Sequence, residues 1–391
     1  MERVSFYKAD ITELEKNLVE NVLESKILTA GPFIWRFQEE VRRYLNARYF
    51  LATSSGFSAL HIAIRVLGWG TGDEVILSPL VHIGVPNTLY SEGIGIQPVD
   101  IEKDRLTLDP EKVREFIVKN YESKNGKLKN KLTGKVLRGI VLYHLYGIPC
   151  NLKEFLKLKE EFGLELLEVC WESFGSSYKF SDGGVFAGLV GDAGVFSFAR
   201  YGAINVGEGG GVVFKNESQY EMGESLRYYG VPTEYVEYQA IISGYNYNLD
   251  EVSSAIGLGQ MMRISEILNK RRRIYEFYRR ELSRVEGIKI IEAPIDSEVS
   301  WYSVVVILPE NVDRDGMIKL LMEAGIPTKV FYPLFTDLML YCESCKVARP
   351  SELDTATSVV KRLLSLPFYG DLTESEVSYV VDSLREALIA R

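Results

Sequence analysis

The stretch FSFARYGAINVGEGG at residues 196–210 ends in closely spaced glycines that lead directly into the apolar residues Val212, Val213 and Phe214. A glycine-rich loop that cradles a phosphate or dinucleotide leads into a helix, whereas this one leads into a predicted strand. The glycines therefore predict a tight turn and not an anion loop. Ser197 falls at the end of the strand that precedes them.

Upstream of this stretch, short apolar runs alternate with amphipathic segments. Predicted strands cover residues 49–53, 74–77, 97–101, 139–144 and 164–169, and amphipathic helices cover residues 56–66 and 152–161. Nearly continuous apolar strands separated by helices indicate a parallel sheet that is covered on both faces. Ligands of such sheets bind at the carboxyl ends of the strands, where Ser55, Glu168 and Ser197 are expected.

The rest of the chain predicts a second, smaller unit. A helical pattern runs from residue 249 to about residue 282, and we expect it to link a domain of residues 1–250 to a domain of residues 251–391. In the second domain, strands are predicted at 288–291 and 302–308, and helices at 314–324, 356–364 and 374–389. The N-terminal segment is expected to pack on this smaller domain. Residues 119–135 are rich in lysine, and we expect a solvated, mobile excursion there.

Seven further motifs stand in order along the chain. They are TAGP at residues 29–32, SSGFSAL at 54–60, GDEV at 72–75, HLYG at 144–147, GD at 191–192, GYNYN at 244–248 and SLPFY at 365–369. Together with residues 196–210, this series resembles the DegT/DnrJ/EryC1/StrS sugar aminotransferase family. The resemblance implies a fold type I aminotransferase-like α/β architecture. It comprises a large domain with a mostly parallel seven-stranded sheet and a smaller C-terminal α/β domain.

The departures from the family pattern gather where its cofactor, pyridoxal phosphate (PLP), binds. The lysine that forms the Schiff base falls on Gly202, and no lysine lies between Lys179 and Lys215. The aspartate beneath the pyridine nitrogen falls on Val169, and the glutamine beside the ring hydroxyl falls on Glu172. We therefore expect no covalent Schiff base to PLP, and expect PLP itself only if the chain is an ordinary transaminase. The resemblance leaves a vestigial pocket made of these residues: Ser55, Gly56, Phe57, Val169, Glu172, Ser197, Gly202 and Asn246.

Three functions remain open. The first is a homologue without transaminase activity that binds a nucleotide sugar or a similar anionic metabolite. It would form a homodimer, or a heteromer with an active paralogue, to which it lends Asn246 and Thr29; Thr29 and Tyr332 are the expected substrate contacts. The second is an enzyme with PLP-independent acid/base chemistry that uses His82, Glu168 and Glu172. The third is a PLP-dependent sugar aminotransferase.

Composition narrows the classes of partner. The chain has 391 residues, of which 46% are hydrophobic, and a formal net charge of −9, which argues against nucleic acid as its main partner. It has no apolar run as long as a membrane span and no signal-peptide pattern, so we expect a cytoplasmic protein without membrane association. Cys342 and Cys345 have the spacing of a redox or zinc pair, but Cys150 and Cys170 stand alone. No metal site is expected, and the choice between a Cys342–Cys345 disulfide and free thiols stays open.

Overall fold

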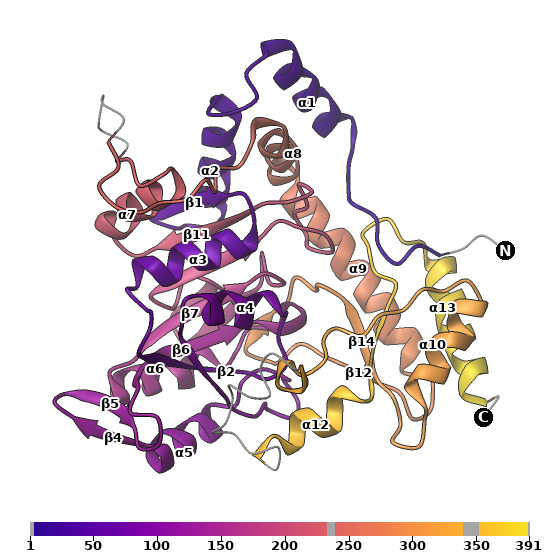
Figure 1. Cartoon of the computed structure of the whole chain (residues 1–391). Coiled ribbons are helices and arrows are strands. Elements are labelled where there is room, and N and C mark those ends of the chain that lie inside the picture. The colour runs from indigo at the N-terminus through magenta and orange to yellow at the C-terminus, as the bar shows by residue number, and fades with distance from the viewer. Residues whose placement is uncertain (1–3, 233–238, 339–351, 390–391) are drawn as a thin grey trace.

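A large mixed sheet forms the centre of the molecule in the computed structural model, which describes residues 4–232, 239–338 and 352–389. Its main path runs β1-β11-β10-β7-β6-β2-β3 (Figure 1). The strands are β1 (Tyr49–Thr53), β2 (Asp73–Leu77), β3 (Gly95–Pro98), β6 (Val136–Tyr143), β7 (Glu165–Cys170), β10 (Ala193–Ser197) and β11 (Gly210–Phe214). β11 is antiparallel to both of its neighbours, and the pairs from β10 to β3 are all parallel. The predicted fold type I α/β class is confirmed.

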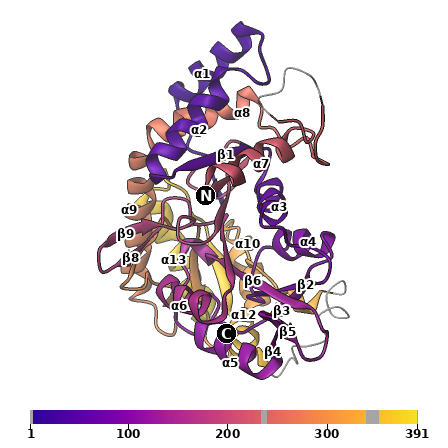
Figure 2. The same ribbon diagram turned by 90° about the vertical axis from the view of Figure 1, so that its left-hand side faces the viewer.

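Helices cover both faces of this sheet, as the apolar strands predict. α3 (Gly56–Val66) and α4 (Gly84–Ser91) lie on one side, and α6 (Leu152–Phe162) lies on the other (Figure 2). α5 (Pro110–Asn120) packs beside α6, and α7 (Glu217–Arg227) packs beside α3. Alternate residues of one strand enter different cores: Val75 packs into the core under α3 and α4, whereas Ile76 packs into the core under α5 and α6.

Helix starts coincide with capping side chains in the sequence. Ser55 caps α3 by accepting a hydrogen bond from Ser58 N at 3.0 Å, and Asp109 caps α5 by accepting from Glu111 N at 2.9 Å. Thr12 and Glu15 form a reciprocal capping box at the start of α1 (Glu13–Ser25). The helix α3 therefore begins at a defined residue after β1, and this fixes where Ser55 and Gly56 stand.

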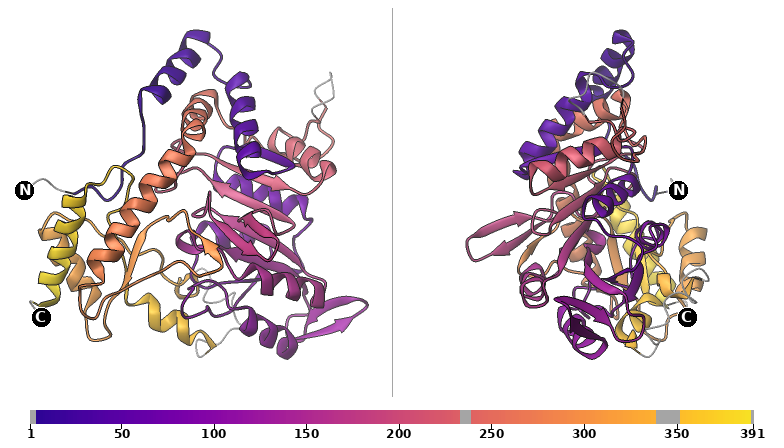
Figure 3. Two further views of the ribbon diagram at one scale, coloured as in Figure 1. Left: turned by 180° about the vertical axis from the view of Figure 1, so that it is seen from behind. Right: turned by 60° about the vertical axis from the view of Figure 1, so that its left-hand side comes forward.

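The predicted helix from 249 to 282 is two helices. α8 (Glu251–Met262) and α9 (Ile264–Leu282) are separated at Arg263, whose guanidinium binds the carboxylates of Asp10 and Glu15 at 3.0 and 2.9 Å. The apolar periodicity continues across Arg263, and the nearest glycine, Gly259, lies inside α8, so the sequence does not mark the position of the break. α8 packs against α1 and α2 (Pro32–Leu45), and α9 then runs beside α13 (Glu374–Ile389) (Figure 3).

The C-terminal part contains a three-stranded antiparallel sheet of β12 (Lys289–Ile290), β14 (Val304–Ile307) and β15 (Leu363–Leu366). α10 (Arg314–Glu323) and α13 match their predicted positions closely. The predicted helix at 356–364 is wrong at its end, because α12 (Asp354–Val360) stops early and the buried residues that follow it form β15 against β14. Phe6 O accepts a hydrogen bond from Phe368 N at 3.0 Å, so the N-terminal segment lies next to this part (Figure 1).

The lysine-rich segment at 119–135 is ordered, contrary to the expectation of a mobile excursion. β4 (Tyr121–Lys124) and β5 (Lys127–Asn130) form a hairpin whose turn residues Asn125 and Gly126 both have positive φ, at 56° and 70°. The buried carboxylate of Glu74 anchors it by accepting hydrogen bonds from Tyr121 and Asn130, each at 2.8 Å. Through β5 the hairpin joins β6 and extends the sheet beyond the seven predicted strands.

A third sheet and two short turns complete the described chain. β8 (Ser177–Phe180), β9 (Gly183–Phe186) and β13 (Ser297–Glu298) form a third sheet, and η1 (Leu145–Gly147) and η2 (Phe335–Asp337) are single 3₁₀ turns. Within the described ranges, no helix combines the length and the apolar character needed to cross a bilayer. Cys342 and Cys345 lie outside the described residues.

Candidate active site

A cavity of about 390 Å³ opens at the carboxyl ends of β1, β7 and β10. Seven residues singled out in the sequence line it together: Ser55, Gly56, Phe57, His82, Glu172, Ser197 and Tyr332. The sequence did not single out the other residues that line it: Gly84, Tyr143, Trp171, Ala199, Arg200, Tyr201, Glu208, Tyr302 and Phe331. Tyr143 directly precedes the HLYG motif, and Trp171 stands between the two altered positions Val169 and Glu172, so their place in the sequence was a signal that residue type alone was not.

Five residues predicted for the site do not line this cavity. Val169 is fully buried within β7, and Glu168 is fully buried beside it. Gly202 also stands outside the lining, and a β-carbon added there would meet Ile204 O at 3.1 Å. Thr29 and Asn246 line a different cavity of about 720 Å³, which Trp35 and Tyr228 share.

Glu168 belongs to a closed hydrogen-bond network. Its carboxylate accepts from His144 Nε2 at 3.0 Å and from the backbone N–H groups of Gly188, Val190 and Gly191 at 2.6–2.9 Å. Burial alone would raise the pKa of this carboxyl, but the bonds from His144 and the backbone hold it below its usual value. The network fixes the turn that precedes β10.

The group His144, Glu168 and Cys170 is the one cluster among the described residues whose potential metal-ligand atoms lie within 4.8 Å of one another. His144 Nδ1 accepts a hydrogen bond from Cys150 N at 3.0 Å, so its Nε2 carries the hydrogen that it donates to Glu168. Neither imidazole nitrogen therefore offers a free lone pair, and the arrangement is typical of a structural hydrogen-bond relay.

Glu172 stands at the centre of a buried tyrosine cluster. Its Oε1 accepts hydrogen bonds from Tyr143 Oη at 2.8 Å and Tyr332 Oη at 2.5 Å, and its Oε2 accepts from Tyr146 N at 2.6 Å. Only 4% of the residue is exposed. Burial raises the pKa of Glu172 to about 7, although these hydrogen bonds act in the opposite direction. The carboxyl can therefore take up or release a proton near neutral pH.

His82 lies between Trp171 and Tyr332, with ring centroids 5.4 and 5.3 Å away in edge-to-face geometry. Its Nδ1 accepts a hydrogen bond from Gly84 N at 3.0 Å at the start of α4. Burial lowers the pKa of His82, so the ring is neutral at physiological pH. Because Nδ1 acts as the acceptor, Nε2 carries the hydrogen.

The indole of Trp171 bridges the first turns of two helices. A β-carbon added to Gly56 would lie 3.0 Å from Trp171 Nε1, and one added to Gly84 would lie 2.9 Å from the opposite end of the same ring system. The ring therefore fills the gap between the starts of α3 and α4, and each glycine is needed for its close approach. Nε1 has no hydrogen-bond partner although the residue is only 9% exposed. Among the described residues that line the cavity, it is the one buried side-chain donor left without an acceptor.

The start of α3, next to this donor, suits an anion. The first N–H groups of α3 have no acceptor within the helix, and the helix dipole favours negative charge at its N-terminus. The β-carbon and Oγ of Ser197 lie 2.7 and 3.0 Å from the position of a β-carbon on Gly56, so the hydroxyl stands at the same place. Ser197 Oγ accepts from Ala199 N at 3.3 Å, which leaves its hydrogen free to donate.

The residues present do not fit the PLP that the sequence resemblance implies. No lysine among the described residues lines the cavity, and the position expected for the acid beneath the pyridine nitrogen is the apolar, buried Val169. The space between the helix starts and His82 holds the indole of Trp171 instead of an open slot for a ring. Lys329, whose Nζ donates to Tyr201 Oη at 2.5 Å, does not line the cavity. An anion fits this site, but a pyridine ring held by an amine and an acid does not.

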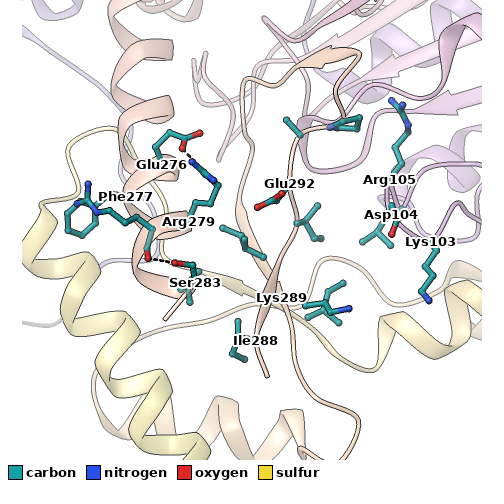
Figure 4. Close-up of a pocket in the computed structure, with 18 of the residues that line it drawn as sticks. Lys103, Asp104, Arg105, Glu276, Phe277, Arg279, Ser283, Ile288, Lys289 and Glu292 are labelled. Carbon is teal, nitrogen blue, oxygen red and sulfur yellow. Dashed lines mark hydrogen bonds and ion pairs between the residues drawn. The ribbon is translucent and has the colours of Figure 1, made fainter. Parts of the chain in front are cut away.

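A larger cavity of about 1080 Å³ lies between α9, the residues around β12 and the loop at 102–106 (Figure 4). Its charged side chains partly neutralise one another: Arg279 binds Glu276 at 2.8 Å, and Arg105 binds Glu102 at 3.7 Å. None of the residues predicted for the site lines it, and it does not lie at the strand ends. The smaller cavity is therefore the candidate site.

Residues 9–385 match the model of the DegT/DnrJ/EryC1/StrS aminotransferase family. Over 388 residues, the chain is 27% identical to GDP-perosamine synthase of Escherichia coli O157:H7, and the match covers 99% of both proteins. The aminotransferase TlmJ of Streptoalloteichus hindustanus is similar in structure, with a TM-score of 0.87, 25% identity and 99% of each chain covered. The protein Spr1654 of Streptococcus pneumoniae, solved in PLP and PMP forms, shares the fold with a TM-score of 0.87 at 21% identity; the match covers all of this chain and 98–99% of the other.

Proposed function

The chain belongs to the DegT/DnrJ/EryC1/StrS aminotransferase family, and from this premise we propose that it binds a nucleotide-linked sugar or a similar anionic metabolite without transaminase chemistry of its own. The observation that carries the proposal is the change of residues in and beside the cavity. Gly202 provides no amine, Val169 provides no acid, and the indole of Trp171 stands between the two helix starts. Because a transaminase needs an amine to hold its cofactor and an acid to draw electrons into the ring, these changes argue against that reaction.

The ligand class follows from the chemistry of the lining. The N-terminus of α3, the hydroxyl of Ser197 and the unpaired Trp171 Nε1 together favour a phosphate or another anionic group. Tyrosine hydroxyl groups and the Glu172 carboxyl at the other side can hydrogen-bond to the hydroxyl groups of a sugar. The name of GDP-perosamine synthase, a relative over nearly the whole chain, agrees with a nucleotide-linked sugar as the ligand class.

We also propose that a second subunit covers the cavity that Thr29 and Asn246 share. Trp35 and Tyr228 line this cavity and expose 51% and 44% of their surface, which is unusual for large rings in a monomer. A partner with the same fold, either another copy or an active relative, would bury them. Thr29 and Asn246 would then stand at the partner's own cleft.

Two measurements on the purified full-length protein test the proposal. After incubation with PLP, visible absorbance and borohydride treatment should show no cofactor fixed to the chain. Isothermal titration should show binding of one of the GDP-, UDP- or dTDP-linked hexoses. Replacing Ser197 by alanine should weaken that binding about tenfold, since it removes a hydrogen bond to a charged group, whereas Ser218→Ala on the exposed face of α7 should leave it unchanged. A borohydride-fixed cofactor in the unmodified protein would overturn the proposal, and so would a failure of all three nucleotide sugars to bind.

The role of the second subunit has a separate test. When the chain is coexpressed with an active relative, Asn246→Ala should lower the activity of the relative, because Asn246 would contact the ligand in the partner's cleft. An unchanged activity in a complex that still forms would contradict this role.

A further inference from the structure

We propose that the cavity carries out cofactor-independent proton transfer beside a carbonyl group of a bound ketosugar, with Glu172 as the base and His82 as the hydrogen-bond donor to the carbonyl oxygen. This inference rests on the proposed function, because it needs a sugar ligand in the same cavity. It goes further by assigning a reaction and the residues that perform it.

The hydrogen bonding of His82 assigns its role. Nδ1 accepts from Gly84 N at 3.0 Å, so a neutral ring must carry its hydrogen on Nε2. The ring stands just before α4, where the helix dipole disfavours a positive charge, and its burial acts in the same direction. A neutral imidazole of this kind is a poor base at Nε2 but a good donor to an oxygen that gains negative charge.

Within the part of the chain that the structure describes, Glu172 is the one buried carboxyl that lines the cavity. Its Oε1 already accepts two hydrogen bonds, whereas Oε2 accepts one from Tyr146 N and keeps a lone pair for a proton. The tyrosines cannot replace it as bases, because burial raises the pKa of Tyr143 and Tyr332 well above the ordinary value. Glu168 is excluded as well, since four donors occupy its carboxylate outside the cavity.

Tyr332 connects the two groups. Its hydroxyl donates to Glu172 at 2.5 Å, and its ring lies 5.3 Å from the ring of His82. One tyrosine side chain therefore spans the separation between the donor and the base. Both groups also line the cavity, so a ligand there can meet the donor and the base together, as the neighbouring atoms of a carbonyl and its α-carbon require.

The reaction needs no group that the cavity lacks. The Glu172 carboxylate removes a proton from the carbon next to the carbonyl, and the electron pair of that C–H bond forms the C=C bond of an enolate. The carbonyl oxygen takes the negative charge and receives the hydrogen bond from His82 Nε2–H. Return of the proton to either face of the same carbon, or to the neighbouring carbon after an oxygen-to-oxygen proton shift, gives an epimer or an isomer. No oxidant or reductant is consumed.

Deuterium exchange tests the reaction. The full-length protein is incubated in D₂O with each of the GDP-, UDP- and dTDP-linked 4-keto-6-deoxyhexoses, and isotope incorporation is followed by NMR and mass spectrometry. We expect deuterium at a carbon that flanks the carbonyl, above the rate without protein. Glu172→Gln should lower the exchange rate at least 100-fold, and His82→Phe about 100-fold, with dissociation constants within about threefold of the original. The exposed Glu323→Gln on α10 is the matched control and should exchange at the original rate.

The outcomes separate this inference from the proposed function. If a ketosugar binds but takes up no deuterium, the inference fails while the binding function stands. If exchange occurs and Glu172→Gln exchanges as fast as the original protein, the assignment of the base is wrong. If no ketosugar and no other nucleotide sugar binds, both proposals fail. Thermal unfolding of each variant controls for folding, and glutamine is the residue that the family resemblance expects at position 172.

Discussion

Replacing Glu172 by glutamine should make the protein more stable at alkaline pH but not at acid pH. Burial raises the pKa of Glu172 from 4.5 in the unfolded chain to about 7 in the folded one. The folded state therefore binds the proton more tightly, and the free energy of unfolding falls as pH rises from about 4.5 to about 7. At 1.36 kcal/mol for each tenfold difference in proton affinity, the loss amounts to about 3 kcal/mol. Glutamine keeps the shape of the side chain but has no charge to bury.

The titratable groups that face Glu172 are Tyr143 and Tyr146 from the end of β6 and the turn after it, and Tyr302 and Tyr332 from the C-terminal part. Burial raises the pKa of each of them well above 10. Between pH 4 and pH 8, Glu172 is thus the group of this cluster that changes charge, and the difference between variant and original protein isolates it.

Urea unfolding of both proteins at several pH values between 4 and 8 measures this difference. The stability of Glu172→Gln relative to the original protein should rise by about 3 kcal/mol from pH 4 to pH 8. The same comparison for the exposed Glu323→Gln should stay within about 0.5 kcal/mol. If the stability of Glu172→Gln relative to the original protein stays constant or falls as pH rises, the reasoning that burial of the charged Glu172 carboxylate lowers the free energy of unfolding is refuted.

Three further results are expected. The deuterium exchange proposed above should speed up as pH rises and level off above about 7, since Glu172 must lose its proton to act as a base; a rate that falls over this range would contradict it. Gly202→Lys with Val169→Asp should gain no borohydride-fixed PLP until Trp171→Ala is added, because the indole fills the gap between the helix starts; fixation by the double variant would show that the ring space is open. Glu251→Ala should lower the free energy of unfolding by about 2 kcal/mol or more in urea unfolding, because its buried carboxylate accepts from two N–H groups at the start of α2; an unchanged stability would show that the cap contributes nothing.

Local patterns predicted most of the fold. The predicted strand at 49–53 and the predicted helix at 374–389 coincide with β1 and α13. An apolar run with a capping side chain at its end defines such an element from local sequence alone. The break at Arg263 escaped prediction because the carboxylates of Asp10 and Glu15, far away in the sequence, hold its side chain. The pair Asn125-Gly126 is a recognisable hairpin turn signal. The lysines around it favoured the prediction of a solvated, mobile segment instead.

The candidate site was predictable in part for a similar reason. Ser55, His82, Glu172 and Ser197 could be expected near one another, because the carboxyl ends of parallel strands share an edge of the sheet. All four line the same cavity. The role of Trp171 was not predictable, since it depends on the distance between the first turns of α3 and α4, which no sequence pattern gives. Glu168 has the same residue type as Glu172, yet backbone donors from a distant turn occupy it. The groups that surround a carboxyl in space, more than its residue type, determine whether it is structural or reactive.

The condition of the cavity distinguishes a site kept in use from one that has decayed. Loss of function without replacement would leave voids and unpaired polar groups, which are costly in a buried site. Here the acid at position 172 has three donors, and the indole of Trp171 reaches close contact with Gly56 at one end and Gly84 at the other. One buried donor of the lining, Trp171 Nε1, still lacks an acceptor, at a cost of about 1–3 kcal/mol. An anionic ligand at the start of α3 would supply that acceptor, which agrees with the proposal that the pocket binds a ligand other than PLP.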